Sequence, residues 1–138
     1  MRLRRYLLTW VAAFAVLVVG DALIHEMWLG SFYRATASWW RPADQMHSLM
    51  HLMFLSQLSL AMLLTFIYAK GYEAGRGALW QGFRFGVLMG LLLAVPANLM
   101  KLFAYPYPPE LIIRWIFGTL VEVTIAGMVI GLLYRPEK

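Results

Sequence analysis

The chain has 138 residues, of which 62% are hydrophobic and only 14% are charged, and its formal net charge is +5. Ordinary globular domains are about 45–50% apolar and about 25% charged, so this composition predicts an integral membrane protein, with residues 1–138 forming one small domain. The absence of cysteine excludes disulfides, thiolate catalysis and cysteine-based metal centres. The basic residues cluster at the ends of apolar blocks rather than along a polar stripe, which argues against nucleic acid as a partner.

Four apolar blocks are each long enough to cross a bilayer, which takes about 20 helical residues. Because lipid offers the backbone no hydrogen-bond partners, each block should be helical. The predicted fold is therefore all-α, an integral membrane four-helix bundle of two helical hairpins, with spans over residues 6–28, 46–68, 80–103 and 111–134. The first block starts like a signal peptide, but it lacks an A-x-A cleavage site, so we expect it to be retained.

The basic residues also predict the orientation, because cytoplasmic segments carry the excess of Lys and Arg. The two termini and the 69–84 connection carry eight of them, whereas the other side carries only Arg34, Arg41, Lys101 and Arg114. Both termini should therefore be cytoplasmic, with residues 29–45 and 104–110 facing outward. An outer belt of aromatic residues is then expected from Trp28, Trp39, Trp40, Tyr105, Tyr107 and Trp115.

The two predicted hairpins are similar in plan. The outgoing helices carry polar residues late, in "GDALIHEMW" and "VPANLMKLF", and the returning helices end in "IYAK" and "LYRP". Such symmetry is compatible with a parallel internal duplication. The alternative is that any four-span protein shows similar chemistry at its helix ends.

Several segments resemble an uncharacterised family of small four-span bacterial inner-membrane proteins: "GDALIHEMWLGSFYRATASWWRPADQM", "YAKGYEAGRG", "GFRFGVLMGLLLAVP" and "GTLVEVTIAGMVIGLLYR". The resemblance implies a four-helix membrane bundle in the bacterial inner (plasma) membrane, and it supplies no activity. His25 belongs to the family pattern, whereas His47 and His51 do not. The most specific match is in the outer loop, at Tyr33, Thr36, Ala37, Trp40, Arg41, Pro42 and Met46.

Charged residues within the spans require a reason, because each costs roughly 2.5–3.5 kcal/mol at the middle of a helix. Glu122 is the twelfth residue of the fourth span, about 16 Å from its start and thus near the midplane. Gln57, Ser56, Ser59 or Thr119 could hydrogen-bond it. Two interpretations stay open: a network that fixes helix packing, or a proton or ion pathway leading to Glu122. The candidate residues are Asp21, His25, Glu26, Asn98, Lys101, Arg114 and Glu122.

Glycines recur every four residues in the last two spans, a spacing that lets helix backbones approach closely. They predict a tight seam, within the bundle or between subunits. Pro96 should kink the third span just before Asn98 and Lys101, and so make room for a small polar pocket or simply bend the helix. The glycines of the predicted seam are Gly82, Gly86, Gly90, Gly127 and Gly131.

The stretch "QMHSLMHLMF" places His47 and His51 one helical turn apart. Together with His25 from the first span they could hold zinc, copper or iron. No set of four ligands has a recognised spacing, however, and methionine is a common apolar filler. We therefore expect packing rather than metal binding, and no cofactor.

The sequence favours a non-enzymatic accessory or structural membrane protein that works as a homo-oligomer or within a larger membrane complex. The alternative is an oligomeric transporter or channel for a small solute, ion or proton, using Glu122, Asp21 and His25. A third class is a metal-dependent membrane enzyme that uses the histidines. No serine has the Gly-x-Ser-x-Gly setting of a hydrolase.

Overall fold

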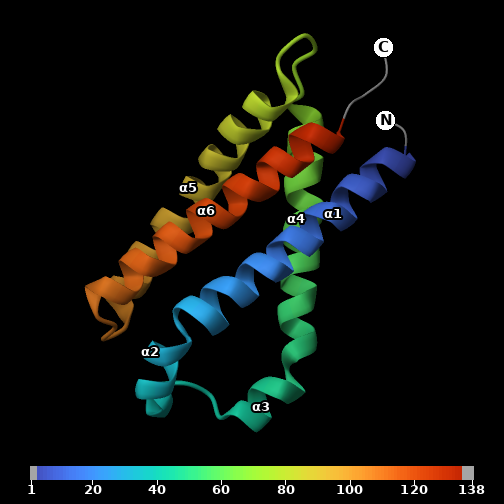
Figure 1. Cartoon of the computed structure of the whole chain (residues 1–138). Coiled ribbons are helices and arrows are strands. Elements are labelled where there is room, and N and C mark those ends of the chain that lie inside the picture. Colours follow the sequence, from blue (N-terminus) through green and yellow to red (C-terminus); the bar gives the residue numbers. More distant parts are fainter. Residues whose placement is uncertain (1–2, 135–138) are drawn as a thin grey trace.

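The computed structural model describes residues 3–134, and every regular element in that range is a helix (Figure 1). Four segments are long and apolar enough to cross a membrane, so the chain is a multi-pass membrane protein with the predicted all-α bundle fold. Arg2, Arg135 and Lys138, which contribute to the predicted charge asymmetry, lie outside the described residues. The long helices are α1 (Leu3–Asp21, continued by η1, Ala22–Trp28), α4 (Met50–Lys70), α5 (Ala78–Ala104) and α6 (Pro109–Leu133).

Both ends of the described chain lie at the same end of the bundle, together with the α4–α5 connection (Figure 1). We call this the terminal end. The opposite end, the loop end, carries the α5–α6 turn and three short elements between η1 and α4. These are α2 (Gly30–Ala35), η2 (Ala37–Trp39) and α3 (Ala43–Ser48).

The second span begins later than predicted. A helix was expected from Met46, but Leu49 leaves helical geometry, with φ −101° and ψ 5°, and α4 begins at Met50. The Leu49 N–H is shared between the carbonyl oxygens of Gln45 and Met46, which closes α3 as a separate turn. The polar segment before Leu49 therefore belongs to the loop end rather than to the span.

The first span changes its helix type where its polar residues begin. From Ala22 to Trp28 it is a π-helix, and the Leu29 N–H accordingly donates to the Ile24 carbonyl five residues earlier at 2.9 Å. Such wide turns are rare and recur at functional sites. Here the π-helix carries His25 into the loop end of the bundle.

The helices pack in the order α5, α6, α1, α4, rather than as a closed square. Helix α6 packs against both α5 and α1, whereas α4 packs mainly on α1. Contacts between α4 and α5 include Tyr68, whose ring meets Phe85 edge-on at 5.2 Å and whose hydroxyl donates to Gln81 at 3.1 Å. Both contacts lie toward the terminal end.

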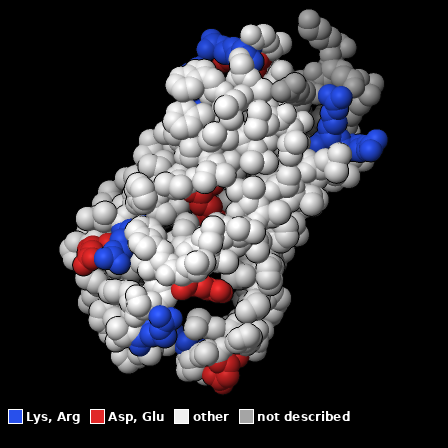
Figure 2. All heavy atoms as spheres, viewed as in Figure 1, with Lys and Arg blue, Asp and Glu red and all other residues white. Residues whose placement is uncertain are grey.

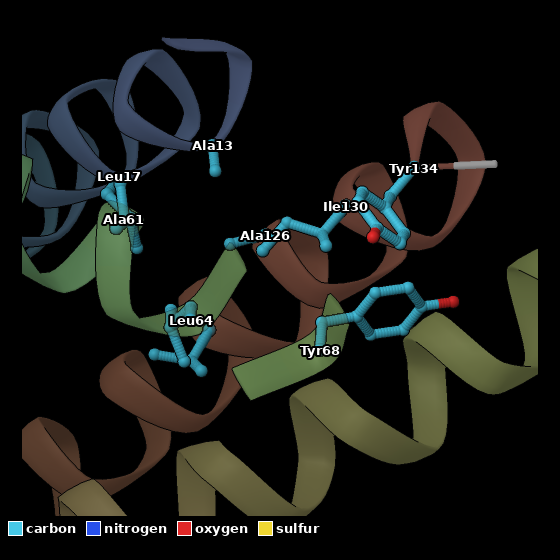
Figure 3. Close-up of a cluster of buried hydrophobic side chains, with 9 residues drawn as sticks. Ala13, Leu17, Ala61, Leu64, Tyr68, Ala126, Ile130 and Tyr134 are labelled. Atoms are coloured by element: carbon cyan, nitrogen blue, oxygen red, sulfur yellow. The ribbon is translucent and has the colours of Figure 1, made fainter. Parts of the chain in front are cut away.

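The buried core joins α1, α4 and α6 in the middle and terminal part of the bundle (Figure 3). Small residues such as Ala13, Ala61 and Ala126 let the three helices approach closely, and the larger Leu17, Leu64 and Ile130 fill the space between them. Tyr68 and Tyr134 close the cluster toward the terminal end (Figure 3). This apolar packing leaves the loop end of the bundle for polar residues.

The five predicted seam glycines lie on the facing sides of α5 and α6, within one chain. A Cβ built on Gly86 would come within 2.6 Å of the Thr124 Cα, and one on Gly127 within 2.6 Å of the Gly86 Cα. One on Gly131 would meet the Ala78 carbonyl at 2.5 Å. Only glycine lets these backbones touch, so the seam joins the two helices of the second hairpin.

Candidate functional site

A polar cavity of about 220 Å³ lies at the loop end between η1, α5 and α6. The face drawn in Figure 2 is hollowed toward this end, beside acidic atoms. Polar and charged side chains are costly inside a membrane, so the cavity in which several of them converge is the candidate site. Its lining consists of Ile24, His25, Asn98, Lys101, Trp115, Thr119 and Glu122.

Glu122 forms the deep end of the cavity. Its side chain is only 8% exposed, and its Oε1 makes no hydrogen bond within residues 3–134. Gly20 of α1 makes room for the carboxyl group, because a Cβ there would lie 2.8 Å from the Glu122 Cγ and 3.1 Å from Oε1. Gly20 was not among the predicted site residues, and its only sequence signal is that it precedes Asp21.

Two of the expected hydrogen-bond partners of Glu122, Gln57 and Ser59, are engaged elsewhere. Gln57 donates through Nε2 to Asp21, and Ser59 donates to the carbonyl of Leu55 in its own helix. Neither side chain is therefore bonded to Glu122 through these donors: that of Gln57 reaches α1, and that of Ser59 bonds its own helix. Thr119 does line the cavity.

Asp21 and His25 connect the cavity to α4. The His25 Nε2 lies 3.7 Å from the Asp21 Oδ1, and Gln57 bonds the other carboxylate oxygen. This polar link joins α1 and α4 near the loop end.

The network continues from His25 to the loop-end aromatics. The Tyr33 hydroxyl lies 2.8 Å from the His25 Nδ1 and accepts the indole N–H of Trp115, also at 2.8 Å. Indole only donates, so the Tyr33 oxygen accepts from Trp115, and the tautomer of His25 sets which of Tyr33 and Nδ1 donates in the second bond. Burial raises the pKa of Tyr33, the Trp115 hydrogen bond lowers it and the charge of Asp21 raises it. The phenol therefore keeps its proton at neutral pH.

Helix α5 supplies the cationic side of the cavity. It continues without a break through Pro96, and the Asn98 amide donates to the Ala94 carbonyl at 2.8 Å. The Lys101 Nζ donates to Asn98 at 3.4 Å and lies 4.9 Å from the centre of the Trp115 ring. The lysine is thus held by an amide and an aromatic face.

Four of the loop-end aromatic residues form a contiguous cluster beside the cavity, which we call the aromatic cap. Tyr33 meets Trp40 edge-on at 5.2 Å, and Trp40 stacks on Tyr107 at 5.6 Å. Tyr107 in turn meets Trp115 edge-on at 5.5 Å. Of the other residues expected in the outer belt, Trp39 contacts Trp40 and Tyr105 stacks on Tyr107, whereas Trp28 packs against Phe117. The cap consists of Tyr33, Trp40, Tyr107 and Trp115.

The remaining predicted residues lie outside the cavity. Glu26 is exposed, and Arg114 forms an ion pair with Glu110 one turn earlier in α6. His47 and His51 are exposed in α3 and α4. Among residues 3–134 there is no group of three or more His, Cys, Asp or Glu placed to hold a metal ion. The three histidines therefore do not assemble into the metal site considered from the sequence.

Comparison of the chain with protein-family models, curated protein sequences and solved structures found no match. The family resemblance of the outer loop therefore stays a prediction. The geometry of the cavity is the basis for assigning a function.

Proposed function

We propose that the protein is a non-enzymatic transport protein that moves protons, or a small solute with a donor group, through the loop-end cavity. One observation carries the proposal: the Glu122 Oε1 is buried and lacks a hydrogen-bond partner within residues 3–134, at the deep end of a polar cavity. An unsatisfied buried acceptor costs about 1–3 kcal/mol. A proton, a water molecule or a protonated solute would remove that cost.

The size of the cavity supports this assignment. A volume of about 220 Å³ exceeds the roughly 15 Å³ that one water molecule needs on the same measure. His25, Asn98, Lys101 and Thr119 offer polar groups along the wall. Water or a small solute entering at the loop end would therefore remain hydrogen-bonded until it reaches Glu122.

The apolar core limits the route beyond Glu122. Toward the terminal end, α1, α4 and α6 meet through residues such as Ala13, Val123 and Ala126, which are 0–1% exposed. Beside Glu122, α1 and α6 also border an apolar hollow of about 380 Å³ that is lined by Val16, Val19 and Gly20 among others. Because this hollow is apolar, a polar solute held at Glu122 would need α1 and α6 to shift against each other in order to proceed. The arrangement fits a carrier that is open toward one side better than a continuous pore.

The test is flux through liposomes that contain the purified protein. With a potassium gradient and valinomycin setting the voltage, a trapped pH dye should report faster proton uptake than in empty liposomes. Uptake equal to that of empty liposomes, with trapped amines and inorganic cations equally retained, would contradict a transport role.

We further propose that the protein resides in the bacterial inner membrane with both termini in the cytoplasm. Basic atoms gather toward the two ends of the bundle (Figure 2), and Arg4, Arg5, Lys70, Arg76 and Arg84 belong to segments at the terminal end. The excess of positive charge there supports the orientation. Reporter fusions after Lys138 and within residues 35–40 should give opposite signals. A periplasmic signal from the C-terminal fusion would contradict it.

A second candidate is an accessory subunit that works as a homo-oligomer or in a larger complex. Its support is the loop-end half of α4, which exposes a run of large apolar side chains and has little contact with α5. The glycine seam does not add to this support, because it lies inside the chain. Copurification of a stoichiometric membrane partner, together with absent flux, would favour this candidate. The exposed residues include Met50, Leu52, Met53, Phe54 and Leu55.

A further inference from the structure

A second hollow of about 450 Å³ lies on the other side of the aromatic cap. We call it the lipid groove. Its wall is almost entirely apolar and includes Ala37, Trp40, Met46 and Trp115. It lies at the loop end, beside the points where the spans end and where lipid headgroups are expected.

Arg34 and Arg41 are also among the residues that line this groove. Both side chains are exposed, and within residues 3–134 neither forms an ion pair, whereas Arg114 pairs with Glu110 and Arg76 with Glu73. Guanidinium groups bind phosphate through paired N–H donors. The groove therefore combines apolar walls with two cations that lack a protein counter-charge.

An occupant that satisfies both features must carry an apolar chain and an anionic group. A soluble phosphate ester would leave the aromatic walls uncovered, and a neutral lipid would leave the two arginines without a net negative partner. We propose that the lipid groove binds one anionic phospholipid, with an acyl chain against Trp40, Trp115 and Met46 and the phosphate held by Arg34 and Arg41.

The groove shares a wall with the polar cavity. Trp115 lines both hollows, and Tyr33, which lines the groove, bonds His25 of the cavity. A bound lipid would thus contact Tyr33 and Trp115, which separate the cavity from the membrane surface. The lipid site itself does not depend on the transport role, so each proposal can fail without the other.

The test uses tryptophan quenching in vesicles of phosphatidylcholine that contain the full-length protein. A minor fraction of the lipid carries brominated acyl chains, on either phosphatidylglycerol or phosphatidylcholine. A bromine atom quenches a tryptophan that it touches, so brominated phosphatidylglycerol should quench more strongly at equal mole fraction. Trp40→Phe should reduce that excess, because Trp40 is one of the reporters.

Two variants then distinguish the contribution of the two positive charges from that of the shape of the groove. The double variant R34Q/R41Q removes the cations, and A37F fills the groove without changing charge; both should abolish the excess quenching. R114Q, a loop-end arginine outside the groove, should retain it. Helical circular dichroism would check that each variant is folded.

Three outcomes would overturn the proposal. The first is that the two brominated lipids quench the wild type equally. Absence of quenching by either lipid counts as this outcome, and is expected if a second copy of the chain covers the groove. The second is full excess quenching in A37F, which would indicate surface attraction without insertion. The third is loss of the excess on addition of glycerol phosphate, which would assign the arginines to a soluble phosphate ester.

Discussion

Gly86→Leu is expected to lower the melting temperature strongly, or to prevent the second hairpin from packing at all. A Cβ at this position would lie 2.6 Å from the Thr124 Cα and 2.7 Å from its carbonyl oxygen, so α5 and α6 would have to separate. Overpacking costs typically about 1–3 kcal/mol, and a leucine that meets backbone should lie at or above the upper end. Circular dichroism during heating in mild detergent would measure the change.

The chain offers controls for this prediction. Gly77 precedes α5 and has no neighbour within 4 Å of a built Cβ, so Gly77→Leu should leave the melting temperature almost unchanged. Gly127→Leu should destabilise to a similar degree as Gly86→Leu, because a Cβ there would touch Gly86 itself. The two seam substitutions disrupt one contact, so their effects should not add. If both seam variants melted at the wild-type temperature, the tight packing of α5 against α6 would be refuted.

Glu122→Gln should abolish proton flux while leaving the fold intact. Glutamine keeps the size of the side chain and its hydrogen-bonding capacity, but it cannot bind and release a proton at neutral pH. Since the Glu122 Oε1 bonds no other group within residues 3–134, the exchange breaks no such bond at that atom, and we expect a stability change below about 1 kcal/mol.

The matched control is Glu110→Gln. Glu110 is also a carboxylate of α6, but it is paired with Arg114 at the surface and does not line the cavity. This variant should conduct like the wild type in the liposome assay. A Glu122→Gln protein that is folded and still carries wild-type flux would show that Glu122 holds no transported proton.

The sequence predicted the features that depend on local composition and spacing. The four spans follow from hydropathy alone, and the four long helices of the structure agree with them. The glycine spacing placed Gly86 and Gly127 on a tight interface, although it could not decide whether that interface lay within one chain. The cost of charge in lipid singled out His25, Lys101 and Glu122, which line one cavity.

Features that depend on contacts between distant segments could not be predicted from the sequence. The bond from Trp115 to Tyr33 joins residues 82 positions apart, and no periodic pattern marks such a pair. The engagement of Gln57 with Asp21 depends on how α4 crosses α1, so the sequence could not tell that this side chain donates to Asp21 rather than to Glu122. The spacing of His47 and His51 indicated a shared helix face, but the break at Leu49 separates them.

Cysteine accessibility tests the central claim, which is that water reaches the depth of Thr119 and Glu122 from the loop end. The chain contains no cysteine, so the variants Thr119→Cys and Phe117→Cys each carry a single thiol. Thr119 lines the cavity, whereas Phe117, two residues away, is 59% exposed on the outer surface of the helices and should face lipid. We predict that a charged, membrane-impermeant thiol reagent added on the loop side labels the Thr119→Cys variant rapidly and the Phe117→Cys variant hardly at all. Equal protection of the two variants would mean that the cavity is closed to water, and would contradict the proposed route to Glu122.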